Sequence, residues 1–469
     1  PQSRDTLPDL VYHWNTGVDA IENDADHVER ARLNLAAAFQ AKQDGEYTIA
    51  STYCEAGLTA LSHVKTDLQT IAPYLKLQLN LERATLDYLQ GQLERSEALI
   101  SQLLPEADRP NDLAALYSLI VVEQTMRGDY ETLWQTLTVG ALKLGISLEL
   151  DNQIPWPQQI RRWPLTLQVT QLDRTQSGKV APSRPICSLL AQAIAPAAIA
   201  GRPERLAALV TQLLTQAPDP TPELAIAYAV GGILFHTCSD LTRARQWLAA
   251  ARLMSHYCGE PRSQYRMQVI HDIYFAPWHE SIATILPRLD RLAIDTLAVR
   301  EVQYSSYSRV ARIVLSLYGG VPLVEVRHQL ADVAAFCQHY HNHWASELTD
   351  CLREHLEVLQ SEVLLAEIET GEIETGEGLP TEDLASGTPF TTLDQGAIDT
   401  SIIGVLNATQ AIQRDYLAEC YDRVIALASQ LEGHTTCLLD FIALAQYQFY
   451  WGLAIAARLA PTPLILSPK

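Results

Sequence analysis

A short phrase recurs along the chain and limits the folds that the chain can adopt. In "KQDGEYTIASTYCEAG", residues 42–57, Gly45 interrupts one helical pattern and Tyr47 begins the next. Apolar residues on both sides recur every three or four positions, which is typical of amphipathic helices. A glycine between such helices can adopt a positive φ at no steric cost and close the turn. The phrase therefore predicts a helix hairpin, and the small residues Ala50 and Gly57 are expected to let the helices approach closely.

Two further copies of the phrase follow, with Gly91 in "YLQGQLERSEALI" and Gly128 in "TMRGDYETLWQTL". Looser copies lack the glycine and place other residues in its turn: Ser239, Leu241 and Ala244, and then Asp415, Tyr416 and Glu419. Helix pairs that recur at such a period indicate a repeat array, and these units are longer than the usual ~34 residues of tetratricopeptide repeats. We therefore predict an all-α chain, an α-α superhelix in the form of a divergent tetratricopeptide-like solenoid of antiparallel helix pairs.

Changes in composition suggest how the array is divided. We expect an N-terminal helical-repeat segment over 1–150, a Pro-rich connector over 151–185 anchored by Trp156 and Trp163, and a central segment over 186–366. An acidic flexible loop with a tandem EIETG is expected over 367–396, before C-terminal hairpins over 397–469. The candidate helices beyond the connector are 186–200, 203–216, 222–237, 241–257, 262–275, 278–294, 299–318, 322–341, 344–368, 397–412, 415–431 and 437–458.

The net charge and the cysteines of the chain argue against several classes of ligand and indicate a cellular compartment. The net charge of −21 argues against nucleic acid and against an anionic membrane surface as ligands. The most apolar run, 437–460, is interrupted by polar residues and suits a core helix better than a membrane span. Eight scattered cysteines without a C-x-x-C motif indicate buried, reduced thiols and a cytoplasmic protein. Because the chain begins at Pro1 without a cationic and apolar leader, we expect no signal peptide and a piece of a longer protein.

Two histidine-bearing segments were weighed as metal sites. In "CQHYHNHW", 337–344, His339 and His343 would share a helix face, whereas Cys337 and His341 would lie on another, so the segment is interpreted as a polar helix end with surface histidines. The segment "HDIYFAPWHE", 271–280, lacks the order of a zinc protease motif and is interpreted as structural. No phosphate-binding loop or nucleophile motif is present. We therefore predict no catalytic, cofactor-binding or metal-binding residue, and no enzyme activity in this chain.

One helix carries candidate contacts to a partner. In "YSSYSRVAR", 304–312, Tyr304, Arg309 and Arg312 are placed to meet a ligand from an inner helix of the array. The alternative is that the arginines balance neighbouring carboxylates within this acidic chain.

Once these residues are considered together, the chain resembles a known region. That region is the tetratricopeptide-like helical-repeat segment of large multidomain bacterial signalling proteins, common in cyanobacteria, in which it accompanies an AAA/STAND-type ATPase and a sensor kinase. The resemblance is carried by a V-x-H-x-N-x-G opening, a Leu-Asn-Leu-Ala helix and a following small-residue helix: Val11, His13, Asn15, Gly17, Leu33, Asn34, Leu35, Ala36, Ala41, Ser51, Thr52, Tyr53 and Ala56. It extends to "TVGALKLGISL", 138–148, to "PWHESIATILPRL" and to "VQYSSYSRVARIVLSLYGG".

The resemblance implies a regulatory or sensory arm rather than a catalytic domain. Its partner would be a protein or peptide, or neighbouring kinase or ATPase domains of the same polypeptide, with no nucleic acid and no membrane insertion. A ligand that prefers one curvature of the array would shift its conformational equilibrium. The alternatives are a purely architectural module for oligomerisation or autoinhibition without an external ligand, and an enzyme whose site is scattered over the solenoid.

Overall fold

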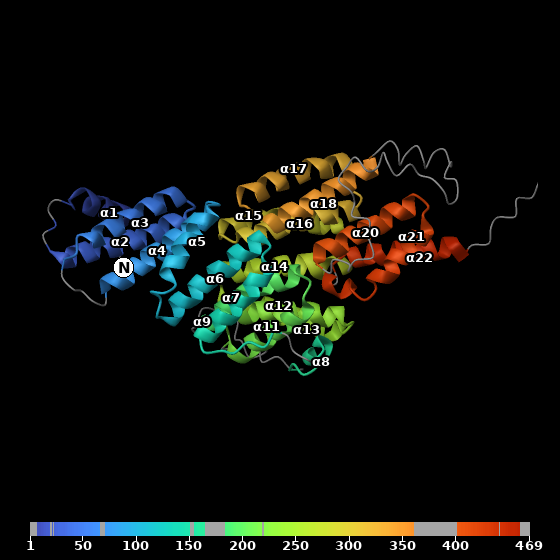
Figure 1. The fold of residues 1–469 in the computed structure, drawn as a ribbon, viewed down its shortest axis with the longest axis horizontal. Helices are drawn as coiled ribbons and strands as arrows, with labels where there is room; N and C mark the ends of the chain where they lie inside the picture. The colour runs from blue at the N-terminus through green and yellow to red at the C-terminus, as the bar shows by residue number, and fades with distance from the viewer. Residues whose placement is uncertain are drawn as a thin grey trace, which may run out of the picture.

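The protein is described here by a computed structural model that covers residues 7–18, 21, 23–65, 71–150, 154–164, 183–217, 220–360, 401–439 and 441–459. Every regular element in these residues is a helix, and successive helices pack as antiparallel pairs (Figure 1). The pairs form an elongated body with α1–α4 at one end and α20–α22 at the other. The fold is an all-α superhelix of helix pairs, which confirms the predicted fold class.

The N-terminal part consists of an entering helix and three hairpins. Its helices are α1 (Leu7–Thr16), α2 (Asp24–Gln43), α3 (Tyr47–Ser62), α4 (Ile71–Leu89), α5 (Leu93–Leu103), α6 (Pro110–Arg127) and α7 (Tyr130–Lys143). The predicted turn glycines Gly45, Gly91 and Gly128 have φ values of +81°, +73° and +74°. After each glycine the chain closes with a hydrogen bond to the carbonyl five residues back, as from Glu46 N–H to Ala41 O (2.9 Å). These are Schellman turns, which satisfy carbonyls at the helix end.

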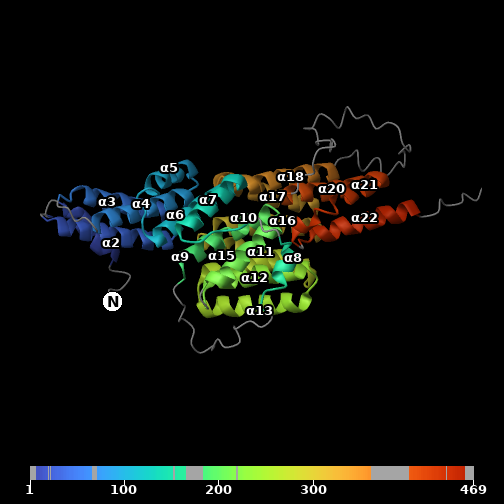
Figure 2. The same ribbon diagram turned by 60° about the horizontal axis from the view of Figure 1, so that its bottom comes forward.

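The centre and the C-terminal part continue the array. The central elements are α8 (Trp156–Ile160), α9 (Pro185–Gln192), α10 (Ile194–Ile199), α11 (Pro203–Gln216), α12 (Pro222–Thr237), α13 (Leu241–Cys258), α14 (Pro261–Tyr274), the 3₁₀ turn η4 (Ala276–Trp278), α15 (Ile282–Ala298), α16 (Val302–Tyr318), α17 (Leu323–His339) and α18 (His343–Gln360). The C-terminal ones are α20 (Ile402–Leu417), α21 (Tyr421–Leu431), η6 (Thr435–Leu438) and α22 (Ala443–Leu459). Figure 2 shows α11, α12 and α13 layered beside the long axis of the body.

Several predicted helix boundaries were wrong for identifiable reasons. The predicted helix 186–200 is two helices, α9 and α10, because Pro196 has no amide hydrogen for the Gln192 carbonyl and its ring crowds that carbonyl. The predicted helix 299–318 begins only at Val302, since Arg300 occupies a Schellman turn with φ +67°. The helix predicted over 278–294 runs from Ile282 to Ala298, after the 3₁₀ turn η4.

The repeat phrase near residue 415 was also placed in the wrong register. Asp415 and Tyr416 were predicted to form the turn, but they lie in the last turn of α20. The turn is at Glu419, whose φ is +57°, and it closes with a hydrogen bond from Cys420 N–H to Asp415 O (2.8 Å). The other loose copy was placed correctly: Ser239 has φ +60° and α13 begins at Leu241.

The described part of the connector packs against the central helices. Trp156 and Trp163 are both 6% exposed. The Trp163 ring stacks on Trp247 of α13 at 5.2 Å, and its Nε1–H donates to Thr211 Oγ1 (3.1 Å). Gly231 of α12 allows this packing, because a Cβ there would lie 2.4 Å from the Trp247 ring. Much of the connector and all of the predicted acidic loop, 367–396, lie outside the described residues.

The buried apolar residues form three clusters. The largest runs from Tyr117 on α6 to Ala454 on α22, and two smaller ones lie within the N-terminal hairpins and where they meet α16. The close approach predicted at Gly57 is present, since a Cβ there would lie 2.9 Å from Leu79 Cδ2 of α4. None of the eight cysteines, all of which the structure describes, forms a disulfide, and five of them are buried; Cys238 is exposed, so the prediction of buried thiols does not hold for every one.

Candidate functional site

The N-terminal hairpins contact the centre of the chain along a seam. We define the seam as the packing of α2, α4, α5 and α6 against the turn before α16 and the turn after α17. Arg300 Nε donates to the carbonyl of Lys42 (2.7 Å), and Gln303 Nε2 donates to the carbonyl of Val122 (3.3 Å). The Gly91 turn lies against the end of α17, because a Cβ at Gly91 would be 2.5 Å from the His339 carbonyl oxygen. The seam thus joins parts of the array that are far apart in sequence.

A cavity of about 200 Å³ lies at this seam and adjoins a second cavity of about 300 Å³ between α6, α9, α12 and α14; together we call them the seam cleft. The walls that they share are formed by Ala115, Ser118, Gln192, Arg262 and Arg266. The charged residues lining the smaller cavity are four cations and one carboxylate: Lys42, Arg262, Arg266, Arg300 and Glu301. The larger cavity adds Arg184 and the carboxylates Glu223 and Glu260. The cleft therefore concentrates positive charge in a strongly acidic chain.

Part of this positive charge is balanced within the protein. Lys42 Nζ lies 2.6 Å from Glu82 Oε1. Arg266 makes a two-pronged contact with Glu301, with Nε and Nη2 at 2.8 and 2.9 Å from its carboxylate oxygens. Arg262 lies farther from the same carboxylate, at 3.8 Å, and its side chain is 47% exposed. The two-pronged pair has the geometry of a strong, charge-assisted hydrogen bond.

Burial and the proximity of like charges shift the pKa values of the cations of the cleft. Burial lowers the pKa of Lys42; Glu82 offsets part of this effect, and Arg262 and Arg300 add to it. Burial likewise lowers the pKa of Arg300, and the nearby Arg262 lowers it further. Arg266 differs, because the Glu301 carboxylate outweighs the cost of burial and raises its pKa. The arrangement suits an anion that would approach Arg262 and Arg300.

An apolar cavity of about 90 Å³ lies deeper, between α10, α12, α14, α16 and α18. Its walls include Tyr304, Tyr307 and Trp344, with the Tyr307 and Trp344 rings 5.5 Å apart. Neither the Tyr307 hydroxyl nor the Trp344 indole N–H has a hydrogen-bond partner. The cavity is smaller than the ~150 Å³ engineered cavity that admits benzene, so it is a small packing gap in the core.

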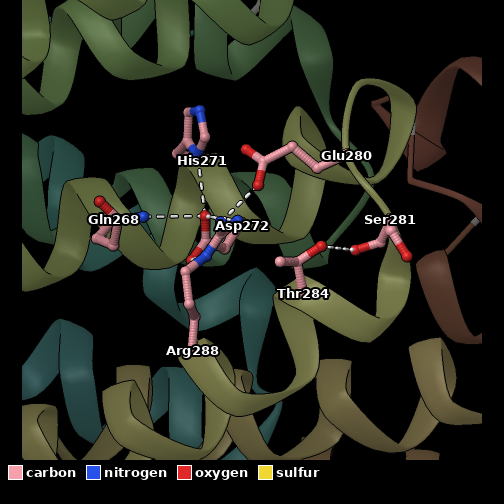
Figure 3. A network of polar contacts seen from close by, with 7 residues as sticks. All are labelled: Gln268, His271, Asp272, Glu280, Ser281, Thr284 and Arg288. Carbon is pink, nitrogen blue, oxygen red and sulfur yellow. Dashed lines mark hydrogen bonds and ion pairs between the residues drawn. The ribbon is translucent and has the colours of Figure 1, made fainter.

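A polar network connects α14 and α15 (Figure 3). The Asp272 carboxylate accepts from His271 Nδ1 at 2.9 Å, from Gln268 Nε2 at 2.9 Å and from Arg288 Nη2 at 3.0 Å. Arg288 also reaches Glu280, in the segment that joins the two helices. Although Asp272 is fully buried, which by itself raises the pKa of its carboxyl, these bonds outweigh burial and lower that pKa. Since the network joins side chains of both helices and of their connection, it serves as a structural clamp.

The structure gives intramolecular contacts to the three residues predicted to meet a partner. Tyr304 is 2% exposed and faces the apolar cavity, with the Arg266 guanidinium 5.2 Å from its ring. Arg309 lies over the Phe336 ring at 4.3 Å. Arg312 forms an ion pair with Asp290, which is the carboxylate-balancing role considered as the alternative. The three side chains do not converge on one site.

The histidine segment after α17 is a polar helix end with surface histidines, as interpreted from the sequence, whereas the shared face considered for a metal site is not formed. His339 and His343 cannot share a helix face, because α17 ends at His339 and α18 begins at His343. His341 has φ +50° in the turn between them, and all three histidines are exposed. Among the residues that the structure describes, no group of three or more His, Cys, Asp or Glu side chains is placed to hold a metal ion.

The outer side of α22 is largely apolar, although it also carries Gln448, and no described element covers it. Its exposed residues recur at helical spacing and include Phe449 and Leu459, which are 56% and 77% exposed, together with Gly452, Ile455 and Ala456. On the opposite side of the helix, Tyr447 is buried and its hydroxyl donates to the Ala428 carbonyl. We call the exposed stripe the α22 face. Over the described residues, no helix has the length and apolarity required to traverse a bilayer.

The sequence did not single out the cations of the seam cleft. Lys42 and Arg300 belong to a helix end and a turn that are 258 residues apart, and although Lys42 opens the first repeat phrase, nothing in that phrase points to a charged site. Comparison of the chain with protein-family models and with curated proteins finds no match.

Proposed function

We propose that the chain is a non-catalytic helical-repeat scaffold, the sensory or regulatory protein-binding arm of a multidomain signalling ATPase or kinase in the bacterial cytoplasm. The observation that carries this proposal is the α22 face. In a helical array an apolar helix side normally packs against the next helix, and an exposed apolar patch marks a surface for a protein neighbour. The signalling context comes from the resemblance of residues 7–61 and later segments to the helical-repeat region of such proteins.

The neighbour on this face is a protein with an apolar helical surface, either another domain of the same polypeptide or a separate partner. Helix-on-helix docking of this kind uses a few apolar anchors at helical spacing, which Phe449, Ile455 and Leu459 provide. The net charge of −21 favours a partner of basic or mixed charge over nucleic acid. A partner that prefers one curvature of the array would shift its conformation and so regulate the attached enzyme.

A first experiment separates this role from the architectural alternative. Size-exclusion chromatography with light scattering would be run on the chain and on a Phe449→Asp/Leu459→Asp variant. Leu142→Asp is the control, because Leu142 is 67% exposed on α7, far from α22 along the chain. A monomer in all three proteins supports the regulatory arm. A dimer that only the α22 variant abolishes supports the oligomerisation module instead.

A second experiment tests the signalling context. The reading frame would be sequenced on both sides of residues 1 and 469, and any kinase or ATPase domain encoded there would be purified. We expect this domain to bind the chain in calorimetry, and the Phe449→Asp/Leu459→Asp variant to lose that binding. A reading frame without such a domain would contradict the proposal.

A further inference from the structure

We propose that the seam cleft binds a small organic dianion, a dicarboxylate or a phosphate ester, and that the bound anion holds the seam closed. The first observation is the sign of the charge. Four of the five charged residues that line the smaller cavity are cations, in a chain whose net charge is −21. This site lies apart from the α22 face, so the proposal goes beyond the proposed function and does not rest on the identity of the protein partner.

The second observation is how the carboxylates of the cleft are used. Both oxygens of Glu301 are engaged by Arg266, and Glu82 is engaged by Lys42. Arg300 uses its Nε on a backbone carbonyl, which carries no net charge. Arg262 has only the longer 3.8 Å contact to Glu301, and its Nε donates to the Val299 carbonyl (3.2 Å). The guanidinium groups of Arg262 and Arg300 therefore keep most of their charge uncompensated.

The cations are also close enough to disfavour one another's charge. The pKa of Lys42 and that of Arg300 are lowered by burial first, and Arg262 contributes to both shifts. The carboxylates Asp44 and Glu82 act on Arg300 in the opposite direction without cancelling this effect. A dianion between Arg262 and Arg300 would relieve the repulsion and replace lost hydration with charge-assisted hydrogen bonds.

The third observation concerns neutral donors and space. The Ser118 hydroxyl lines both cavities, is shielded from solvent and has no hydrogen-bond partner. The Gln192 side chain also faces both cavities. Volumes of about 200 and 300 Å³ lie at the small end of ligand sites, which typically run from roughly 300 Å³ upwards. These dimensions favour a compact organic anion over a folded partner.

Because the cleft lies at the seam, its occupancy is linked to the conformation of the array. Lys42 and Arg300 belong to opposite sides of the seam, and the Arg300 bond to the Lys42 carbonyl spans it. An anion held by residues from both sides binds the closed arrangement better than an open one. By mass action the closed form becomes more stable as the concentration of the anion rises above its Kd.

The test uses the full chain at low ionic strength, where screening of the site is least. Calorimetry and thermal unfolding would be measured with glycerol 3-phosphate, a phosphate monoester, and, separately, with succinate. We expect at least one of them to bind and to raise the unfolding temperature. Glycerol 3-phosphate binding alone would identify phosphate chemistry, and succinate binding alone would identify carboxylate chemistry.

Variants locate the binding. Arg262→Gln and Arg300→Gln are each expected to weaken affinity by about tenfold or more, the value of one charge-assisted hydrogen bond. Arg291→Gln on α15 is the matched control, since Arg291 is exposed and pairs only with Asp295 one helical turn away; its affinity should stay unchanged. If Arg300→Gln fails to fold, as judged by circular dichroism, Arg262→Gln decides the question, because its side chain is half exposed. Absence of binding by both dianions, or equal affinity in all variants, would overturn the proposal.

Discussion

The side chain of Arg300 donates a hydrogen bond to the backbone carbonyl of Lys42, 2.7 Å away, although 258 residues separate them in the chain. Each residue lies at a hairpin turn: Lys42 is in the last turn of α2, close to Gly45, and Arg300 occupies the turn before α16. The Gly91 turn approaches the end of α17 in the same way. Contacts between turns therefore form much of the seam, together with the bond from Gln303 of α16 to the Val122 carbonyl of α6.

Gly91→Ala should destabilise the protein more than Gly128→Ala. Both glycines have positive φ, so each substitution places Ala in the left-handed region at about 1 kcal/mol. Nothing lies within 4 Å of a Cβ at Gly128, whereas a Cβ at Gly91 meets the His339 carbonyl oxygen at 2.5 Å. We expect Gly91→Ala to lose about 1–3 kcal/mol more from overpacking, measured by urea unfolding. Equal losses of unfolding free energy in the two variants would show that the seam accommodates the added Cβ without an energetic penalty.

Asp272→Asn should be strongly destabilising. The fully buried carboxylate accepts hydrogen bonds from His271, Gln268 and Arg288, and the substitution leaves the Arg288 cation without its buried counter-charge. We expect a loss of about 3 kcal/mol in the free energy of unfolding. Asp350→Asn is the control, since it breaks an exposed pair with Arg353 worth about 0.5 kcal/mol or less. Similar losses in both variants would contradict the role of the Asp272 clamp.

Acid should weaken the protein through His355. Burial first, and then the nearby Arg414 cation, lower the pKa of this histidine to about 3, from an ordinary value of 6.5. The folded protein keeps His355 neutral while the unfolded chain takes up a proton below pH 6.5, so stability is lost as pH falls from 6.5 towards 3. In His355→Gln this contribution disappears, and the urea midpoint should fall less between pH 7 and pH 5 than in the wild type. Parallel pH profiles of the two proteins would exclude this assignment.

Glu123 should act in the opposite direction. Burial raises the pKa of its carboxyl from 4.5 to about 7, so the folded state holds a proton that the unfolded chain releases. Stability is then lost as pH rises from 4.5 through 7. We expect Glu123→Gln to be more stable than the wild type at pH 8, by up to about 3 kcal/mol, and similar to it near pH 4.5. Glu29→Gln is the control, because Glu29 is 45% exposed in its pair with Arg32 and should change little.

The helix pairs could be predicted from the sequence wherever a glycine marked the turn. Gly45, Gly91 and Gly128 all adopt the expected left-handed conformation. The turns at Arg300, His341 and Glu419 adopt it without glycine and were missed or misplaced. Residues other than glycine can adopt the left-handed conformation at a modest energetic cost, which the surrounding structure can offset. Such turns therefore cannot be recognised from the amino-acid composition of the segment.

The seam cleft could not be predicted, because its residues come together only through tertiary packing. Lys42 is a helix-end lysine in the first hairpin, and Arg262 is an ordinary surface arginine at the start of α14. Their relationship depends on how the first hairpins pack against α16 and α17. The prediction for Tyr304, Arg309 and Arg312 relied on their common helix, α16, but that helix is covered on several sides and directs the three to different neighbours.

The seam also affects how the protein unfolds. In a helical array whose units touch only their neighbours, the ends can fray one unit at a time, and damage to one unit stays local. Here the first hairpins contact the middle of the chain. Unfolding of α2 and α4 therefore also breaks their contacts with the turns at Arg300 and His339. Their loss is thereby coupled to that of α15–α17, and the array up to α17 should melt as one cooperative block.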